Sequence, residues 1–169
     1  MLVKTAISEE EYLATSFPDL DREYCDGKLV KRSLPDYQHG ATQANISTFF
    51  CRLRKERGLP VFGGSSVRNR VRTRWYRIPD VCAFWPDEPA ESIPEIRPHV
   101  VVEILSQDDT MVEVLAKLRE YLDWGVPHIW LINPRHKTFF TYGPLGLRET
   151  ATLPIPEVDA EMLPSDAFD

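Results

Sequence analysis

Residues 99–105, His-Val-Val-Val-Glu-Ile-Leu, form a short apolar run that a single acid interrupts. Such a run, rich in β-branched residues, is typical of a strand buried on both faces of a sheet. A carboxylate inside it is costly unless it is paired, hydrogen-bonded or bound to a cation. The stretch therefore predicts a strand in a central sheet and marks Glu103 as a residue that needs a specific partner.

A helix over residues 110–124 is the clearest element after this strand. Thr110 with Glu113 fits a capping box at its start, and Gly125 is typical of a helix end. Lys117 lies about 100° from the centre of the apolar stripe, at roughly 100° per residue. We therefore expect its ammonium to reach over the ends of the neighbouring strands. The stripe consists of Met111, Val114, Leu115, Leu118 and Leu122.

A second carboxylate follows Pro79 at the start of another predicted strand, residues 78–85. If Asp80 and Glu103 lie on neighbouring strands, the two carboxylates meet at one edge of the sheet. Like charges that close need a counter-ion, and Mg²⁺ and Mn²⁺ prefer oxygen ligands. A metal ion beside an ammonium such as that of Lys117 can orient and acidify a water for attack on phosphorus. The three residues together indicate a site for a metal and a phosphate.

The order of the predicted elements indicates an α/β fold, with a central mixed β-sheet flanked by helices and an N-terminal β-hairpin. Asp26-Gly27 between two short runs is a strong signal for that hairpin. Residues 1–143 are expected to form one domain, and residues 144–169 an extended, irregular tail that packs on it. Leu163 and Phe168 are expected to dock this tail. The other expected elements are helices over residues 8–16 and 37–57 and strands near residues 61–62, 128–133 and 138–142.

The charge of the chain is unevenly distributed. The net charge of −6 and the 43% share of hydrophobic residues are ordinary for a globular protein of 169 residues. Residues 52–77 carry nine basic residues and one acid, a net +8, so the rest carries −14. A local basic surface can still engage phosphates, because salt screens charges beyond about 10 Å.

Four alternating arginines, Arg68, Arg70, Arg72 and Arg74, would share one face of a strand within this basic segment. They are candidate nucleic-acid-binding residues. The other interpretation is a solvated edge face, since charge on an edge strand also discourages aggregation.

The compartment is predicted from what the sequence lacks. No apolar run approaches the length of a membrane span, and the start, MLVKTAISEEEYL, lacks the apolar core of a signal peptide. The three cysteines lie far apart without a C-x-x-C pair, which argues against a zinc knuckle or a disulfide framework. A cytoplasmic protein without a membrane partner is expected.

The ordered segments resemble one known group of proteins. Pro79-Asp80, then Glu103-Ile104-Leu105-Ser106, then Lys117 on the next helix is similar to the PD-(D/E)XK nuclease superfamily. The closer resemblance is to its restriction endonuclease branch, the Uma-two family, and covers residues 8–143. The similar segments are REYCDGKLV, YQHG, RIPDVCAF, VVVEILSQDD, KLREYLDWGVPHIWLINP and TFFTY.

This resemblance implies a restriction-endonuclease-like fold and Mg²⁺- or Mn²⁺-dependent hydrolysis of DNA phosphodiester bonds. It assigns the metal to Asp80 and Glu103, together with the carbonyl of Ile104. It assigns to Lys117 the positioning of the attacking water and the stabilisation of charge on phosphorus. Leu105 departs from the wider superfamily, which has a lysine at this position, and the branch is expected to use the helix lysine instead.

Two more catalytic candidates come from the resemblance. Glu23 would hydrate the metal or orient Lys117, but it can also be read as a solvent-facing strand residue. His39 would contact the phosphate or the leaving group, but it can also be read as a packed core residue.

DNA is thus the expected partner, and a homodimer would suit the cutting of both strands. Two alternatives stay open because fold does not dictate function. The first is a catalytically inactive nuclease-fold protein that acts as a DNA-binding or protein-interaction module, which the net charge and Leu105 favour. The second is a metal-dependent hydrolase of another phosphate ester.

Overall fold

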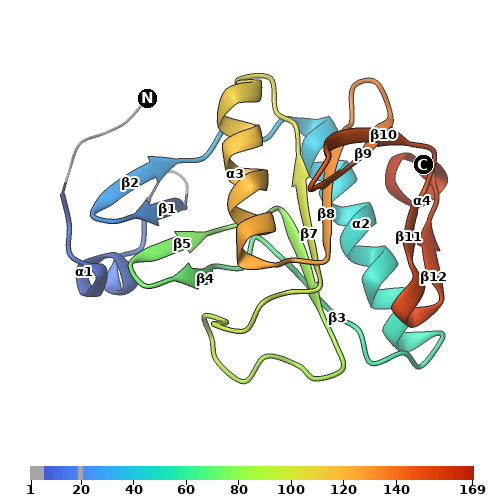
Figure 1. The fold of residues 1–169 in the computed structure, drawn as a ribbon, viewed down its shortest axis with the longest axis horizontal. Helices are drawn as coiled ribbons and strands as arrows, with labels where there is room; N and C mark the ends of the chain where they lie inside the picture. The colour runs from blue at the N-terminus through green and yellow to red at the C-terminus, as the bar shows by residue number, and fades with distance from the viewer. Residues whose placement is uncertain (1–5, 19–20) are drawn as a thin grey trace.

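The computed structural model describes residues 6–18 and 21–169, and its centre is a six-stranded sheet with the order β10-β9-β8-β7-β6-β3. A four-stranded sheet, β2-β1-β5-β4, lies beside it, and β11 pairs with β12 (Figure 1). The helices are α1 (Glu9–Ala14), α2 (Tyr37–Lys55), α3 (Met111–Trp124) and α4 (Pro164–Phe168), with a 3₁₀ helix η1 (Pro156–Val158). The strands are β1 (Arg22–Cys25), β2 (Lys28–Lys31), β3 (Phe62–Ser65), β4 (Asn69–Arg72), β5 (Trp75–Arg77), β6 (Val81–Phe84), β7 (Val100–Ile104), β8 (His128–Asn133), β9 (Thr138–Gly143), β10 (Gly146–Thr150), β11 (Leu153–Ile155) and β12 (Ala160–Met162).

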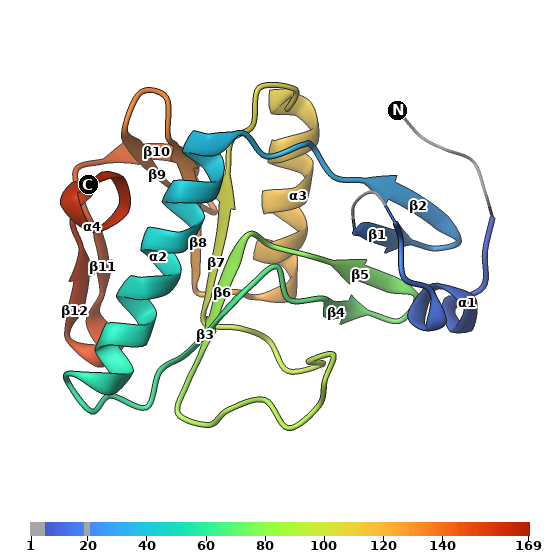
Figure 2. The same cartoon turned by 180° about the vertical axis from the view of Figure 1, so that it is seen from behind.

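Helices cover both faces of the large sheet (Figures 1 and 2). The apolar core on one face joins α2, β11, β12 and α4 to Val100, Val102 and Ile104 of β7. The core on the other face joins α3 to Val101 of the same strand. The alternation of side chains along β7 therefore turns Glu103 toward α3. Since β7 runs parallel to β8 and antiparallel to β6, the sheet is mixed, and the predicted fold class is confirmed.

The local signals in the sequence mark real boundaries. The Thr110 side chain accepts a hydrogen bond from the Glu113 N–H at the start of α3, and Gly125 ends the helix with a φ of 87°. Asp26 and Gly27 turn the β1–β2 hairpin with φ values of 46° and 88°. This pair of positive φ angles is the geometry that an Asp-Gly hairpin turn requires.

The prediction of a single strand that carries the four alternating arginines is wrong. The chain reverses there, so that β4 and β5 form an antiparallel hairpin with a register shift between Arg70 and Arg72. Arg74 lies in the turn with a φ of 58°. A shared face for Arg68, Arg70, Arg72 and Arg74 therefore does not exist.

The description of residues 144–169 as extended and irregular is also wrong. β10 pairs with β9 in the large sheet, and β11, β12 and α4 add a second layer against α2. Phe168 stacks on Phe139 with ring centroids 5.2 Å apart, whereas Leu163 stays 43% exposed. The domain boundary at residue 143 stays a prediction, and residues 1–5 and 19–20 of that domain lie outside the described residues. Within residues 6–18 and 21–169, no helix has both the length and the apolar character to cross a membrane.

Candidate active site

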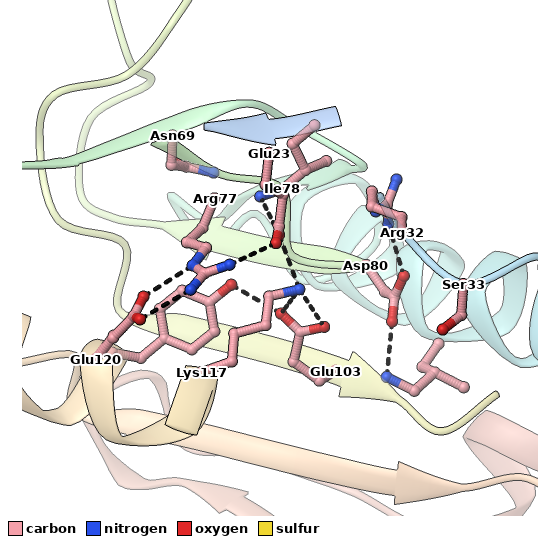
Figure 3. Close-up of polar contacts among 12 residues, drawn as sticks. Glu23, Arg32, Ser33, Asn69, Arg77, Ile78, Asp80, Glu103, Lys117 and Glu120 are labelled. Carbon is pink, nitrogen blue, oxygen red and sulfur yellow. Dashed lines mark hydrogen bonds and ion pairs between the residues drawn. The ribbon is translucent and has the colours of Figure 1, made fainter. Parts of the chain in front are cut away.

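A pocket of about 680 Å³ opens where the two sheets and α3 meet. The chain crosses from the small sheet to the large one through Ile78-Pro79-Asp80, between β5 and β6. β1 brings Glu23 to the pocket, β7 brings Glu103, and α3 brings Lys117. Segments that lie far apart in the sequence therefore meet around one cavity (Figure 3).

Asp80 is held by three groups. Its Oδ2 accepts a hydrogen bond of 2.7 Å from the backbone N–H of Ile104 and lies 3.3 Å from Nε2 of His39. Its Oδ1 accepts a hydrogen bond of 2.9 Å from Nη2 of Arg32. Burial raises the pKa of Asp80, but His39 and Arg32 outweigh burial and hold it below the ordinary value. Asp80 is therefore an ionised carboxylate.

Glu103 lies next to Asp80 across the β6–β7 pair, because Val81 is the register partner of Val102. Lys117 places its Nζ 3.0 Å from the Glu103 carboxylate. On the same helix, the Tyr121 hydroxyl donates a hydrogen bond of 2.7 Å to Glu103. The costly acid in the buried strand thus has a cation and a hydroxyl as partners.

Glu23 is the second partner of Lys117, with Oε1 2.8 Å from Nζ. The Ile78 N–H donates a hydrogen bond of 2.9 Å to Oε1, and Arg77 Nη1 donates one of 2.7 Å to Oε2. Arg77 also makes two hydrogen bonds of 2.8 Å to Glu120 of α3. Such bidentate pairing fixes orientation as well as charge. Glu23 is therefore a buried ion-pair residue, and its interpretation as a solvent-facing strand residue is wrong.

The two glutamates that contact Lys117 are shifted in opposite directions. Burial raises the pKa of Glu23, but Lys117, Arg77 and the Ile78 N–H together lower it to about 2. Burial also raises the pKa of Glu103, Lys117 opposes this, and Asp80 and Glu23 add to it, so that the pKa reaches about 7. Burial and the neighbouring carboxylates therefore disfavour the ionised form of Glu103 more than Lys117 favours it.

Lys117 and His39 are shifted toward their cationic forms. Burial lowers the pKa of Lys117, but Glu103, Glu23 and Asp80 outweigh burial and raise it. Burial likewise lowers the pKa of His39, and its hydrogen bond to Asp80 raises it above the ordinary value. Among the described residues, the buried Nδ1 of His39 has no hydrogen-bond partner.

All five predicted catalytic residues, and Ile104, line this one pocket. The four arginines do not, since each contacts another part of the chain. Arg68 lies over the ring of Tyr12 and Arg72 over that of Trp75, while Arg70 pairs with Glu95 and Arg74 with Asp26. DNA binding by these arginines stays a prediction.

Sequence reasoning missed four residues of the charge cluster. Helical spacing could have found Glu120 and Tyr121, because they lie three and four residues after Lys117. Arg32 and Arg77 follow or end short strands, and nothing in the local sequence connects them to Asp80 or Glu23.

Asp80 and Glu103 have the donor chemistry that a hard divalent cation needs. Mg²⁺ commonly binds through one or two carboxylates and keeps its other positions for water and substrate phosphates. In the part of the chain that the structure describes, no group of three or more His, Cys, Asp or Glu side chains is arranged to hold a metal. Two carboxylates side by side on the wall of an open pocket are a donor set that fits such a cation.

A large mixed sheet between helices, with one carboxylate on a central strand, a second just before the adjacent strand and a helix lysine beside them, defines a restriction-endonuclease-like α/β protein. The Uma2 family, described as "Putative restriction endonuclease", matches residues 9–168, and the chain belongs to this family. The structure of this chain is similar to that of a "putative nuclease belonging to DUF820" from Anabaena variabilis, with a TM-score of 0.80. The two share 24% sequence identity over 96% of this chain and 97% of the other. A comparison with curated proteins found no match.

Proposed function

We propose that this protein is an endodeoxyribonuclease that hydrolyses DNA phosphodiester bonds with Mg²⁺ or Mn²⁺. The observation that carries the proposal is the position of Lys117, whose Nζ lies 3.0 Å from Glu103 in the pocket that Asp80 also lines. Membership of the family described as "Putative restriction endonuclease" supports the reaction class.

In this proposal Asp80, Glu103 and the carbonyl of Ile104 hold the cation. When bound, the cation supplies a Lewis acid and an acidified water. Lys117, kept protonated by its carboxylate partners, orients the attacking water and stabilises the charge that develops on phosphorus.

Positioning falls to the remaining residues of the pocket. Glu23 holds Lys117 in place, because Arg77 and the Ile78 N–H fix both of its oxygens. His39 lies beside Asp80 on the wall of the pocket and would contact the phosphate or the leaving group. A homodimer would place two such pockets on the two strands of a duplex.

Nicking of supercoiled plasmid DNA tests the proposal. We expect cleavage with Mg²⁺ or Mn²⁺, no cleavage in a chelator, and a loss of at least about a hundredfold in Glu103→Ala and Lys117→Ala. Glu149→Ala and Lys55→Ala are matched controls, since both residues are exposed. Metal binding by the protein without cleavage of DNA, RNA or a simple phosphate ester would contradict the proposal.

A non-catalytic DNA-binding or protein-interaction module is the second candidate. The observation that favours it is the ion pair between Asp80 and Arg32, which neutralises this carboxylate without a metal. Binding of duplex DNA that is equally strong in a chelator and in Mg²⁺, with no cleavage, is the outcome that this candidate predicts.

A further inference from the structure

We propose that Arg32 is a phosphate-binding residue that a divalent cation releases from Asp80, so that cation and DNA bind cooperatively. The inference rests on the proposed function, because it takes Asp80 as a metal ligand and DNA as the substrate.

The backbone of Arg32 is fixed beside the pocket. Residue 32 begins the link between β2 and α2, and residues 32–35 all line the cavity. The Ser33 hydroxyl donates to Asp109 at 2.5 Å, and Gln107 donates to Asp36 at 3.2 Å. These bonds tie the link to the loop between β7 and α3. The guanidinium of Arg32 can therefore move while its backbone stays in place.

Arg32 is the cation of the cluster that is released most easily. Arg77 and Lys117 each contact two carboxylates, whereas in the described part of the chain Arg32 pairs with Asp80 alone. Its side chain is 15% exposed, between Arg77 at 10% and Lys117 at 18%, so the number of carboxylate partners distinguishes it from the other two cations. A cation at Asp80 repels all three groups, and the one with a single carboxylate partner gives way.

The charge balance of the cluster indicates that the released guanidinium of Arg32 binds an anion. The cluster has four carboxylates, Glu23, Asp80, Glu103 and Glu120, against the cations Arg32, Arg77 and Lys117, with His39 beside Asp80. These groups sum to −1, or to zero with His39 protonated, so a divalent cation gives this cluster an excess of positive charge, while Asp21, Asp108, Asp109 and Glu113 line the rest of the pocket. An anion in the pocket restores the balance. The planar fork of an arginine matches a phosphate in two hydrogen bonds.

Two measurable effects follow because coupling between two ligands is reciprocal. Removing the charge of Arg32 removes a competitor for Asp80, so the cation binds more tightly. The same change removes a phosphate contact, so the cation strengthens DNA binding less than it does in the wild type.

The experiment measures Mn²⁺ binding to the full chain by electron paramagnetic resonance, without nucleic acid. We expect Arg32→Gln to bind Mn²⁺ about tenfold more tightly, the effect of one unit charge close to the ion after screening by solvent. Lys31→Gln is the matched control, because Lys31 is the exposed neighbour of Arg32 on the same wall. Its Mn²⁺ affinity should stay within about twofold of the wild type, as a more distant exposed charge is screened.

The DNA measurement uses the anisotropy of a labelled duplex in a chelator and in Ca²⁺, with a gel to show that the strand is intact. Ca²⁺ should strengthen binding to the wild type, and this gain should fall by about five- to tenfold in Arg32→Gln, as one phosphate contact is lost. Arg32→Lys keeps the charge, so its Mn²⁺ affinity should match the wild type. Its gain from Ca²⁺ should still fall, because lysine lacks the planar fork.

Each outcome decides the inference. Suppose that the wild type binds Mn²⁺ and nicks DNA. If Arg32→Gln then binds Mn²⁺ no more tightly than the wild type, the inference is overturned and the proposed function stands. If no form of the protein binds Mn²⁺, both are overturned. Binding by Arg32→Gln but not by the wild type supports the inference. Should Arg32→Gln fail to fold, Arg32→Lys decides it, since a tenfold change in the Mn²⁺ affinity of that variant would overturn competition by charge.

Discussion

Replacing Glu103 by glutamine is expected to stabilise the protein at pH 8 and to change its stability little at pH 4 or below. Burial, together with Asp80 and Glu23, raises the pKa of Glu103 from 4.5 to about 7 in the folded protein, against the opposing effect of Lys117. Below pH 4.5 the carboxyl group is protonated in both the folded and the unfolded state. Between pH 4.5 and 7 the unfolded chain loses its proton first, and the free energy of unfolding falls.

The size of the effect follows from the pKa. A change from 4.5 to about 7 corresponds to about 3 kcal/mol above pH 7, at 1.36 kcal/mol for each pKa unit. Glutamine keeps the shape of the protonated acid and cannot ionise, so Glu103→Gln avoids this cost, while Lys117 retains Glu23 as a partner. For a chain of this length, about 3 kcal/mol raises the melting temperature by about 6–12 °C.

Calorimetry of both proteins at pH 4 and pH 8 checks the prediction. Glu149→Gln is the matched control for the substitution itself, at an exposed position of β10. Equal stability differences for Glu103→Gln at the two pH values would refute the reasoning. A less stable variant at both pH values would show that the ion pair with Lys117 outweighs the cost of burial. Adding Mg²⁺ at pH 8 should stabilise the wild type more than the variant, because a ligand stabilises the state that binds it.

Other changes test the cluster and the packing. Glu23→Gln should destabilise the protein by about 3 kcal/mol at pH 7, because the pKa of Glu23 lies near 2 in the folded state and near 4.5 in the unfolded state. In urea unfolding, the difference in unfolding free energy between Glu23→Gln and the wild type should disappear as the pH falls from 4.5 toward 2. A difference that stays constant over this range would contradict the low pKa of Glu23. Gly40→Ala should stabilise α2 by about 0.5–1 kcal/mol, because nothing lies within 4 Å of the added methyl group. Gly63→Ala should cost about 1–3 kcal/mol, since its methyl group would lie 2.8 Å from Cβ of Phe50. If Gly63→Ala had a higher melting temperature than Gly40→Ala, the contacts described around the two glycines would be contradicted.

The central strand and α3 could be predicted because their signals are local. Burial on both faces makes β7 apolar at nearly every position, and the caps at Thr110 and Gly125 lie next to the helix that they bound. The residues that signal the ends of such elements lie next to those ends in the sequence. The meeting of Asp80, Glu103 and Lys117 could be predicted only through the ordered resemblance, since no spacing within the chain fixes their distances.

The errors have a physical cause. A two-residue reversal at Thr73-Arg74 leaves the period-two alternation of the arginines intact, and it lacks the glycine or asparagine that usually marks such a turn. Residues 144–169 contain Pro144, Pro154, Pro156 and Pro164, and so many prolines favour irregular structure in a reading of the sequence alone. Pro154 nevertheless lies in β11, whose pairing in the described sheet is with β12 alone, and such an edge position tolerates proline.

Contacts between distant segments could not be predicted. Arg32 lies 48 residues before Asp80, and Arg77 lies 43 residues before Glu120. A charged residue at the end of a short strand is ordinary in a soluble protein. Only the docking of the two sheets gives these arginines their partners.

Because Ile78-Pro79-Asp80 joins the two sheets, the charge cluster around Lys117 is assembled only when both sheets are folded. Glu23 and Arg77 belong to the small sheet, whereas Asp80 and Glu103 belong to the large one or its edge. Local opening of the small sheet therefore carries two members of the cluster away, even if the large sheet stays folded. Amide exchange in β1 and β5 would report the same opening free energy as the disassembly of the cluster. A partly unfolded chain can thus keep its main core and still have no assembled site.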